Sequence, residues 1–326
     1  MGPPYAALTP EVLLDAVESC GVRCDGRLQG LNSYENRVYQ VWLEDGTSVV
    51  AKFYRPLRWS AAAIQEEHDF ALELAAREIP VVAPLQFDGR TRHEHGGFQF
   101  AVYPRRGGRS PELEDPDTLR WMGRFIARIH AVGGTRPFVH RPRLDIAGFG
   151  YEPAQFVIDS GYVPEDMRAA YSSVVADVLE RAQHCLDAAG PYRALRLHGD
   201  CHAGNVLWTD DGPHFVDLDD ARMGPAVQDL WMCLSGDRHA QQIQLAALLA
   251  GYSEFRNFDP AELALIEVLR TLRMVHYAGW LARRWDDPAF PASFPFFNTQ
   301  RYWQDHVLAL REQAAALDEP PLQWQG

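Results

Sequence analysis

Cysteine is scarce in this chain of 326 residues, which contains five. They form an odd, scattered set that lacks the paired spacings of a disulfide framework. The sequence therefore predicts reduced thiols and a cytoplasmic location. The five are Cys20, Cys24, Cys185, Cys201 and Cys233.

Long apolar runs are also missing, and none reaches the length of a transmembrane helix. The first residues contain only a short apolar run with no basic segment before it. We therefore expect no membrane association and no signal peptide.

Positive charge is in deficit: 31 lysines and arginines stand against 44 acidic residues, for a formal net charge of −13. This balance argues against nucleic acid and anionic membranes as partners. Apolar residues make up 47% and charged residues 23%, an ordinary globular composition. A chain of this length can bury a large core and is expected to divide into two lobes.

A polar motif in the second half of the chain carries the strongest chemical signal. Asp200 is followed after four residues by Asn205, and a short apolar run, an Asp-Gly turn and a second apolar run then lead to Asp217. Two strands around such a turn predict a hairpin, which would return Asn205 and Asp217 to the same end, near Asp200. Phosphoryl transfer needs this set: one carboxylate meets the hydroxyl proton, and an amide oxygen and a second carboxylate hold Mg²⁺. The spacing matches the protein-kinase template.

Two other metal sites can be weighed at the same motif. His198 and His202 are four apart, as in a zinc pair on a helix, but glycines interrupt the segment and no third ligand follows at a diagnostic spacing. A calcium loop opening at Asp217 would need a glutamate where Gln228 stands. The sequence leaves open whether Asp219 belongs to the metal site.

A solvated acidic turn is the remaining interpretation of the motif, because Asp and Gly gather in turns. Asp217, however, directly follows an apolar strand. Acidic groups clustered at the end of a buried strand repel one another unless a cation neutralises them. The motif therefore favours a metal site.

A polar turn over residues 30–36, GLNSYEN, precedes predicted strands at 37–43 and 47–54. It has the position of a phosphate-covering loop, in which backbone N–H groups and the Ser33 hydroxyl meet nucleotide oxygens. An ordinary hairpin entry is the alternative, because the turn has one glycine where nucleotide loops usually have several.

Lys52 lies within an apolar strand, where a lysine is costly unless it is paired or points to solvent from an edge strand. The segment 61–79 predicts an amphipathic helix that ends at Pro80. Glu67 falls within its apolar face, whereas Glu66 falls near the polar edge. The sequence therefore predicts a Lys52–Glu67 pair that positions the lysine on nucleotide phosphates.

A strand over 98–103 stops at Pro104, and an Arg/Gly-rich connector follows. We place the domain boundary here, between an N-lobe of residues 1–104 and a C-lobe of residues 105–326. The backbone of Val102 and Tyr103 would then contact the adenine edge.

Beyond the boundary the pattern is mainly helical, so the fold class is α+β with a small β-rich lobe and a larger helical lobe. An irregular Pro-aromatic loop is expected at 290–297. Helices are predicted at 9–19, 115–132, 164–189, 226–234, 240–255, 260–285 and 302–317.

This order and these motifs resemble the aminoglycoside-phosphotransferase-like kinase superfamily, which has a two-lobed kinase fold. Within it, the resemblance is closer to the bacterial stress response kinase A family, the YihE/RdoA serine/threonine protein kinases. It is carried by GLNSYENRVYQV, VVAKFYRP, EEHDFALEL, LRLHGDCHAGNVLW, FVDLDDARMGPAVQDLWM and DPAFP.

The resemblance implies roles for individual residues. Asp200 would be the proton acceptor, and Asn205 and Asp217 would hold Mg²⁺. Ser33 and Lys52 would lie on ATP, with Glu67 paired to Lys52. Asp229 would brace the catalytic loop.

The sequence thus predicts a kinase that uses ATP and Mg²⁺ to phosphorylate protein serine or threonine in a bacterial stress response. Two alternatives stay open. One is a small-molecule kinase acting on an amino alcohol, a sugar or an aminoglycoside-type acceptor. The other is a non-catalytic nucleotide-binding regulator, against which the intact set of Lys52, Asp200, Asn205 and Asp217 argues.

Overall fold

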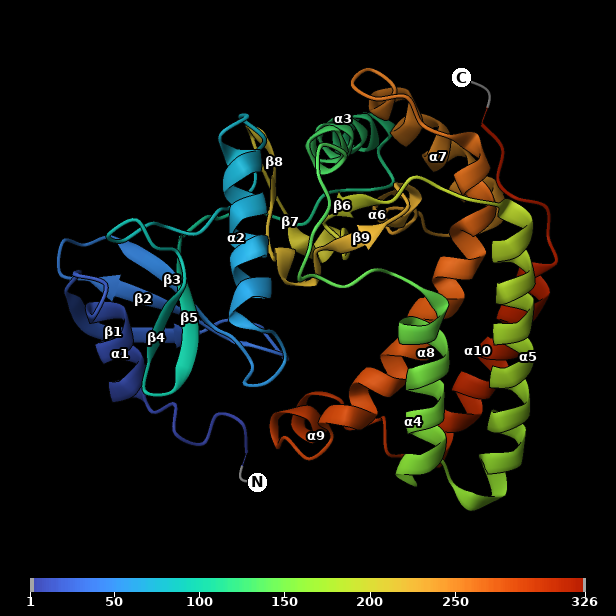
Figure 1. The fold of residues 1–326 in the computed structure, drawn as a ribbon, viewed down its shortest axis with the longest axis horizontal. Coiled ribbons are helices and arrows are strands. Elements are labelled where there is room, and N and C mark those ends of the chain that lie inside the picture. Colours follow the sequence, from blue (N-terminus) through green and yellow to red (C-terminus); the bar gives the residue numbers. More distant parts are fainter. Residues whose placement is uncertain (1–2, 325–326) are drawn as a thin grey trace.

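The computed structural model describes residues 3–324. Its N-terminal part is a five-stranded antiparallel sheet in the order β1-β2-β3-β5-β4 (Figure 1). Alternating side chains of β2 and β3 turn inward and share a core with α1, which Thr9 caps. The elements are α1 (Pro10–Glu18), β1 (Cys24–Gly30), β2 (Arg37–Leu43), β3 (Ser48–Phe53), β4 (His93–His95) and β5 (Phe98–Pro104).

Helix α2 (Ala61–Ala75) stands between this sheet and the helical remainder of the chain (Figure 1). Ser60 accepts a hydrogen bond from the N–H of Ala63 and caps its start. The helix ends four residues before the predicted boundary at 79. Glu78 adopts a left-handed conformation with φ of 55°, and Pro80 disfavours helical geometry in the residue before it.

The rest of the chain is mainly helical, with two small two-stranded sheets, β6-β9 and β7-β8. Its helices are α3 (Pro116–Gly133), α4 (Glu152–Ser160), α5 (Glu165–Ala189), α6 (Val227–Trp231), α7 (Arg238–Tyr252), α8 (Ile266–Arg284), α9 (Ala289–Ser293) and α10 (Gln300–Leu317). Its strands are β6 (Leu195–Leu197), β7 (Val206–Thr209), β8 (Gly212–Phe215) and β9 (Arg222–Gly224).

Two predicted elements differ from the structure, and one helix of the structure was not predicted. The single helix predicted at 260–285 is a 3₁₀ segment, Pro260–Leu265, followed by α8. Helix α4 has no counterpart in the prediction, because glycines and Pro153 obscure its pattern. The loop predicted at 290–297 overlaps α9.

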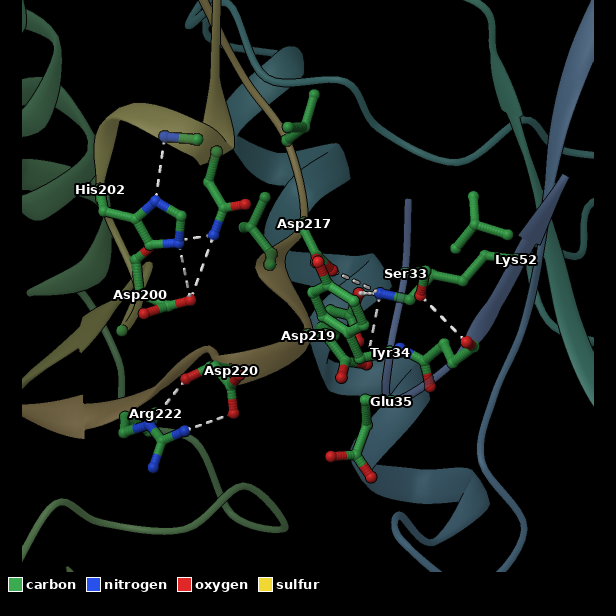
Figure 2. Close-up of a pocket in the computed structure, with 18 of the residues that line it drawn as sticks. Ser33, Tyr34, Glu35, Lys52, Asp200, His202, Asp217, Asp219, Asp220 and Arg222 are labelled. Atoms are coloured by element: carbon green, nitrogen blue, oxygen red, sulfur yellow. Dashed lines mark hydrogen bonds and ion pairs between the residues drawn. The ribbon is translucent and has the colours of Figure 1, made fainter. Parts of the chain in front are cut away.

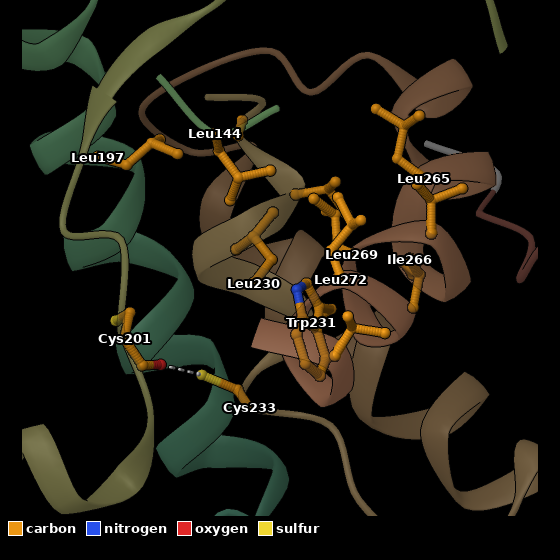
Figure 3. Packing of buried hydrophobic residues seen from close by; sticks show 14 of the residues in the cluster. Leu144, Leu197, Cys201, Leu230, Trp231, Cys233, Leu265, Ile266, Leu269 and Leu272 are labelled. Carbon is orange, nitrogen blue, oxygen red and sulfur yellow. Dashed lines mark hydrogen bonds between the residues drawn. The ribbon is translucent and has the colours of Figure 1, made fainter. Parts of the chain in front are cut away.

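One large apolar core lies in the helical part and extends into α2 through Phe70 and Leu74. Part of this core packs beneath the segment that follows β6, where Cys201 lies against Cys233 of the chain after α6 (Figure 3). All five cysteines are free thiols in the structure. The division at residue 104 stays a prediction, although β5 ends there.

Among residues 3–324, no helix combines the length and apolar character needed to cross a membrane.

Candidate active site

A cavity of about 780 Å³ lies where the five-stranded sheet, α2, the β7-β8 hairpin and α8 meet. Most of the residues singled out in the sequence line it, although they come from distant parts of the chain. They are Ser33, Lys52, Glu67, Tyr103, Asp200, Asn205 and Asp217. The lining of this cavity does not include Val102.

The β7-β8 hairpin brings the polar motif together as its pattern predicts. Val206 pairs with Phe215, and the N–H of Val216 donates to the carbonyl of Asn205 over 3.0 Å. The Asn205 amide donates to the backbone carbonyl of Asp200 over 2.9 Å and approaches its carboxylate at 3.3 Å. Asp217 follows at the same end (Figure 2).

Asp217 leaves the strand in a left-handed conformation, with φ of 58°. Aspartate tolerates this region better than most residues, and such outliers gather at functional sites. The turn leaves its side chain 53% exposed toward the cavity. The carboxylate is therefore accessible to a bound group.

The carboxylate of Asp200 has partners on both oxygens. Arg273 of α8 donates to Oδ1 over 2.7 Å, and His202 lies 3.3 Å from Oδ2. Burial alone would raise the pKa of Asp200, but His202 and Arg273 hold it well below its usual range. Asp200 is therefore ionised at neutral pH.

The segment that carries Asp200 is held rigidly from beneath. The carboxylate of Asp229 accepts the backbone N–H groups of His198 and Gly199, each over 2.8 Å. His130 supplies a further partner at 3.0 Å. Gly199 has φ of 86°, and a β-carbon there would lie 2.1 Å from the carbonyl oxygen of Asp220, so no larger residue fits.

Lys52 is buried among three carboxylates. Its Nζ lies 2.9 Å from Asp217, 3.3 Å from Asp219 and 3.7 Å from Glu67. Burial favours the neutral amine, yet the carboxylates of Asp217, Asp219 and Glu67 together raise the pKa of Lys52 above its usual value. The lysine is therefore a fixed cation facing the cavity.

Glu67 is 3% exposed and lies beside Lys52, whereas its neighbour Glu66 binds backbone groups of another segment. The Glu66 carboxylate accepts the backbone N–H groups of Val139, His140 and Arg141 at 2.7 to 2.9 Å. It therefore ties α2 to the segment before α4. The helical pattern distinguishes the inward glutamate from the outward one, but not this backbone contact.

Asp219, whose part in a metal site the sequence left open, is 3% exposed. Its carboxylate is paired with Lys52 and Arg58, and its backbone carbonyl accepts from Arg141. Burial alone would raise the pKa of Asp219, but Arg58 and Lys52 hold it at about 2. These contacts indicate that Asp219 positions Lys52.

The predicted phosphate loop is anchored to the helical part of the chain. Ser33 donates to the carbonyl of Asn36 over 3.0 Å, which shapes the turn. The Glu35 carboxylate accepts from Trp280 over 2.5 Å and from Arg284 over 2.7 Å, both on α8. Sequence reasoning missed these contacts, because they join residues about 250 positions apart, and no local pattern reports such pairs.

The two residues proposed for the adenine edge differ in position. Tyr103 lines the cavity. Val102 is fully buried, and its carbonyl accepts the N–H of Leu85 over 2.7 Å. The geometry therefore favours Tyr103 and the neighbouring Pro104 over Val102 as a cavity contact.

The oxygen ligands at the end of the hairpin fit a magnesium ion that is bound together with phosphates. The Asn205 amide turns its nitrogen to Asp200, which leaves its oxygen for a cation, and Asp217 adds an accessible carboxylate. Within residues 3–324, no group of three or more His, Cys, Asp or Glu side chains is placed to hold a metal alone. Magnesium commonly binds through one or two carboxylates plus substrate phosphates.

The chain matches the phosphotransferase enzyme family over residues 27–266 and belongs to this family. Stress response kinase A of Escherichia coli is 47% identical over 319 residues, which cover 98% of this chain and 96% of that protein. The serine/threonine protein kinase RdoA of Salmonella typhimurium is also 47% identical, with the same coverage.

Solved structures confirm the kinase fold. The amicoumacin kinase hAmiN, in complex with AMP-PNP, Ca²⁺ and Ami, has a TM-score of 0.71 at 19% identity, covering 94% of this chain and 93% of that one. A microcompartment-associated aminopropanol kinase has a TM-score of 0.71 at 17% identity, covering 93% and 95%. The α+β, two-lobed class predicted from the sequence is therefore correct. The family match and the relatives of 47% identity show that the chain is a kinase.

Glu67→Gln is expected to change how activity depends on pH. Burial raises the pKa of Glu67 to about 7, although Lys52 opposes the shift. As pH falls through this value, the carboxylate takes up a proton and its attraction for Lys52 is lost. We expect kcat/KM of the parent protein to decrease as the pH is lowered past about 7. The variant should be roughly 10-fold less active and lack this limb.

Glu66→Gln is the matched control for this prediction. It replaces one of the two oxygens that accept three backbone N–H groups with an NH2 donor, and it should lower the melting temperature while keeping the pH limb. Glu67→Gln should keep its stability above pH 7, because ionising a buried acid with a raised pKa costs folding free energy there. If the loss of activity below about pH 7 persists in Glu67→Gln, the titrating group is not Glu67.

Proposed function

We propose that this protein is an ATP- and Mg²⁺-dependent kinase that phosphorylates serine or threonine of proteins in a cytoplasmic, bacterial stress response. The observation that carries the proposal is the convergence of Lys52, Asp200, Asn205 and Asp217 on one cavity. The protein acceptor is supported by the names of relatives that match over nearly the whole chain.

Asp200 is proposed to receive the proton of the acceptor hydroxyl. The acceptor oxygen forms a bond to the γ-phosphorus, the bond from that phosphorus to the β,γ-bridging oxygen breaks, and ADP leaves with the electron pair. The low pKa of Asp200 keeps its carboxylate ready to orient the hydroxyl, and the bonds from Asp229 hold the loop in place. Such positioning supplies much of the rate enhancement in this reaction class.

The nucleotide is proposed to lie between the lobes 1–104 and 105–326. Lys52 would bind phosphate oxygens, held by Glu67 and Asp219. Ser33 and the backbone of its loop would cover the phosphates, and Tyr103 would lie toward the base. Asn205 and Asp217 would hold Mg²⁺, which neutralises phosphate charge when bound.

A small-molecule acceptor is the second candidate. Helix α8 and the aromatic residues Trp280 and Phe294 line one side of the cavity, which would enclose a compact acceptor. The two solved kinases named above share the fold only, so their acceptors do not decide between the candidates.

The test offers labelled ATP and Mg²⁺ to the purified protein with a whole-protein extract and, separately, with a metabolite pool. Asp200→Ala serves as the control for contaminating kinases. Label on protein serine or threonine that depends on Asp200 supports the proposal. Label confined to the metabolite pool would replace it with the small-molecule alternative.

A further inference from the structure

Arg273 occupies a distinctive place on the acceptor side of the cavity. It projects from α8, and its Nη1 donates to Oδ1 of Asp200 over 2.7 Å. Its side chain is nevertheless 46% exposed. The guanidinium group carries five N–H donors, so this single bond leaves most of them available to another group in the cavity.

Both oxygens of Asp200 are in use in this arrangement. Oδ2 faces His202 and Asn205, which belong to the same loop as Asp200 and stay with it. Oδ1 faces Arg273, which is 73 positions away on another element. The Arg273 side chain is 46% exposed and comes from another element, so Arg273 is the partner that can move away without disturbing the loop of Asp200. An acceptor hydroxyl that approaches Oδ1 must displace or share this bond.

The other acidic side chains of the cavity already have basic partners. Asp220, for example, is bonded to Arg58 and to Arg222, and Figure 2 shows the Arg222 contact. Among residues 3–324, the cavity lining offers no acidic side chain without a basic partner. A cationic acceptor therefore finds no carboxylate without a basic partner, whereas an anionic acceptor can reach the N–H donors that Arg273 keeps beyond its single bond to Asp200.

We propose that Arg273 selects acceptors that carry an anionic group beside the hydroxyl, in particular a serine or threonine flanked by an acidic residue in a peptide. This inference rests on the proposed function. The acceptor carboxylate replaces Asp200 as the partner of Arg273, and Oδ1 becomes free to meet the hydroxyl. The guanidinium exchanges one carboxylate for another, and Asp200 keeps His202 and Asn205 on Oδ2.

A peptide and a free hydroxy acid can both offer an anionic group beside a hydroxyl. The aromatic residues that line the cavity favour the peptide. Tyr34 and Tyr277 line the cavity and are 47% and 39% exposed. Tyr34 packs against Phe294 with ring centroids 4.7 Å apart, and Tyr277 stacks on Trp280. Exposed aromatic rings of this kind offer contact area to residues that flank the phosphorylated one.

The experiment uses serine peptides in which a single glutamate is moved through the positions around the serine. Each is compared with the same peptide containing glutamine. In the full-length protein, we expect one position at which glutamate raises kcat/KM by roughly 10- to 100-fold, the usual range for a hydrogen bond to a charged group. Arg273→Gln should remove this preference, and Arg273→Glu should transfer it to peptides with lysine.

Arg283→Ala is the matched control, because Arg283 lies exposed on the same helix and contacts Phe156. It should keep the preference for glutamate. Mg·ATP affinity measured by calorimetry should be unchanged in Arg273→Gln, which shows that the variant is folded. The acidic peptide with alanine in place of serine should bind the parent protein and lose about 10-fold or more in affinity for Arg273→Gln.

Equal rates for glutamate and glutamine peptides, or a preference that survives Arg273→Gln, would overturn the inference. A second experiment compares hydroxy acids with amino alcohols as acceptors. It separates failure of the role of Arg273 from failure of the proposed function. Arg273-dependent phosphorylation of hydroxy acids without any peptide phosphorylation would refute the protein acceptor and keep the role of Arg273. A preference for amino alcohols would refute the role of Arg273.

Discussion

Asp200→Ala is expected to lower kcat by about 10² to 10⁴-fold, the range associated with a lost acid–base group. In the proposed mechanism, its carboxylate meets the acceptor hydroxyl, whereas Lys52, Asn205 and Asp217 would face the nucleotide and its metal. The loss therefore belongs to the chemical step, and affinity for Mg·ATP should stay within several-fold of the parent value. Single-turnover phosphoryl transfer and calorimetry with Mg·ATP measure the two quantities separately.

Asp210→Ala provides a matched control, because Asp210 is an exposed aspartate at the tip of the same hairpin. It should leave both quantities unchanged. Asp200→Asn adds a variant that keeps the side-chain shape, removes the charge and turns one acceptor oxygen into an NH2 donor. Turnover comparable with that of the parent protein in both Asp200 variants would exclude Asp200 as the proton acceptor.

The sequence was most informative where local geometry dictates position. The hairpin, in which the loop residues are Asp210 and Asp211 and Thr209 pairs with Gly212, brings Asn205 and Asp217 to one end, because antiparallel pairing across a short turn allows no other outcome. The helical period likewise separates Glu67 from Glu66 by 100° around α2, and the first is buried while the second is partly exposed. Short-range periodicity was sufficient for these residues.

The arginines around the cavity could not be predicted in this way. Arg58 and Arg273 pair with carboxylates 161 and 73 positions away, and nothing in their own segments indicates a partner. Their contacts follow from how the sheet, α2 and α8 pack together. Asp219 was ambiguous for the same reason, because its buried pairing with Lys52 and Arg58 depends on that packing.

Missed elements have a similar cause. Gly150, which precedes α4, allows close packing, since a β-carbon there would lie 2.7 Å from the side chain of Leu179 on α5, and that side chain would have to shift. In the sequence, this glycine and Pro153 indicate a loop. A glycine that allows two helices to pack closely therefore weakens the sequence pattern of the helix that follows it.

Asp217→Asn is expected to weaken Mg·ATP binding by roughly 100-fold or more, since losing even an outer partner of a bound metal commonly costs 10- to 100-fold. The change replaces a charged oxygen with a neutral amide and keeps the shape of the side chain. Asparagine also tolerates the left-handed backbone found at this position, so the fold should be preserved. Asn205→Ala should weaken binding more mildly, because it removes a neutral ligand.

The decisive measurement compares calorimetry with Mg·ATP against calorimetry with ATP and a chelator. Lys52 keeps Asp219 and Glu67 as partners in Asp217→Asn, so binding of metal-free ATP should be unchanged or slightly stronger once a negative charge near the phosphates is removed. Asp219→Asn is the contrasting variant. It removes one of the carboxylates that neutralise the buried cations Lys52 and Arg58, and it should lower stability with or without Mg²⁺. Unchanged Mg·ATP affinity in both Asp217→Asn and Asn205→Ala would show that the hairpin does not hold the metal.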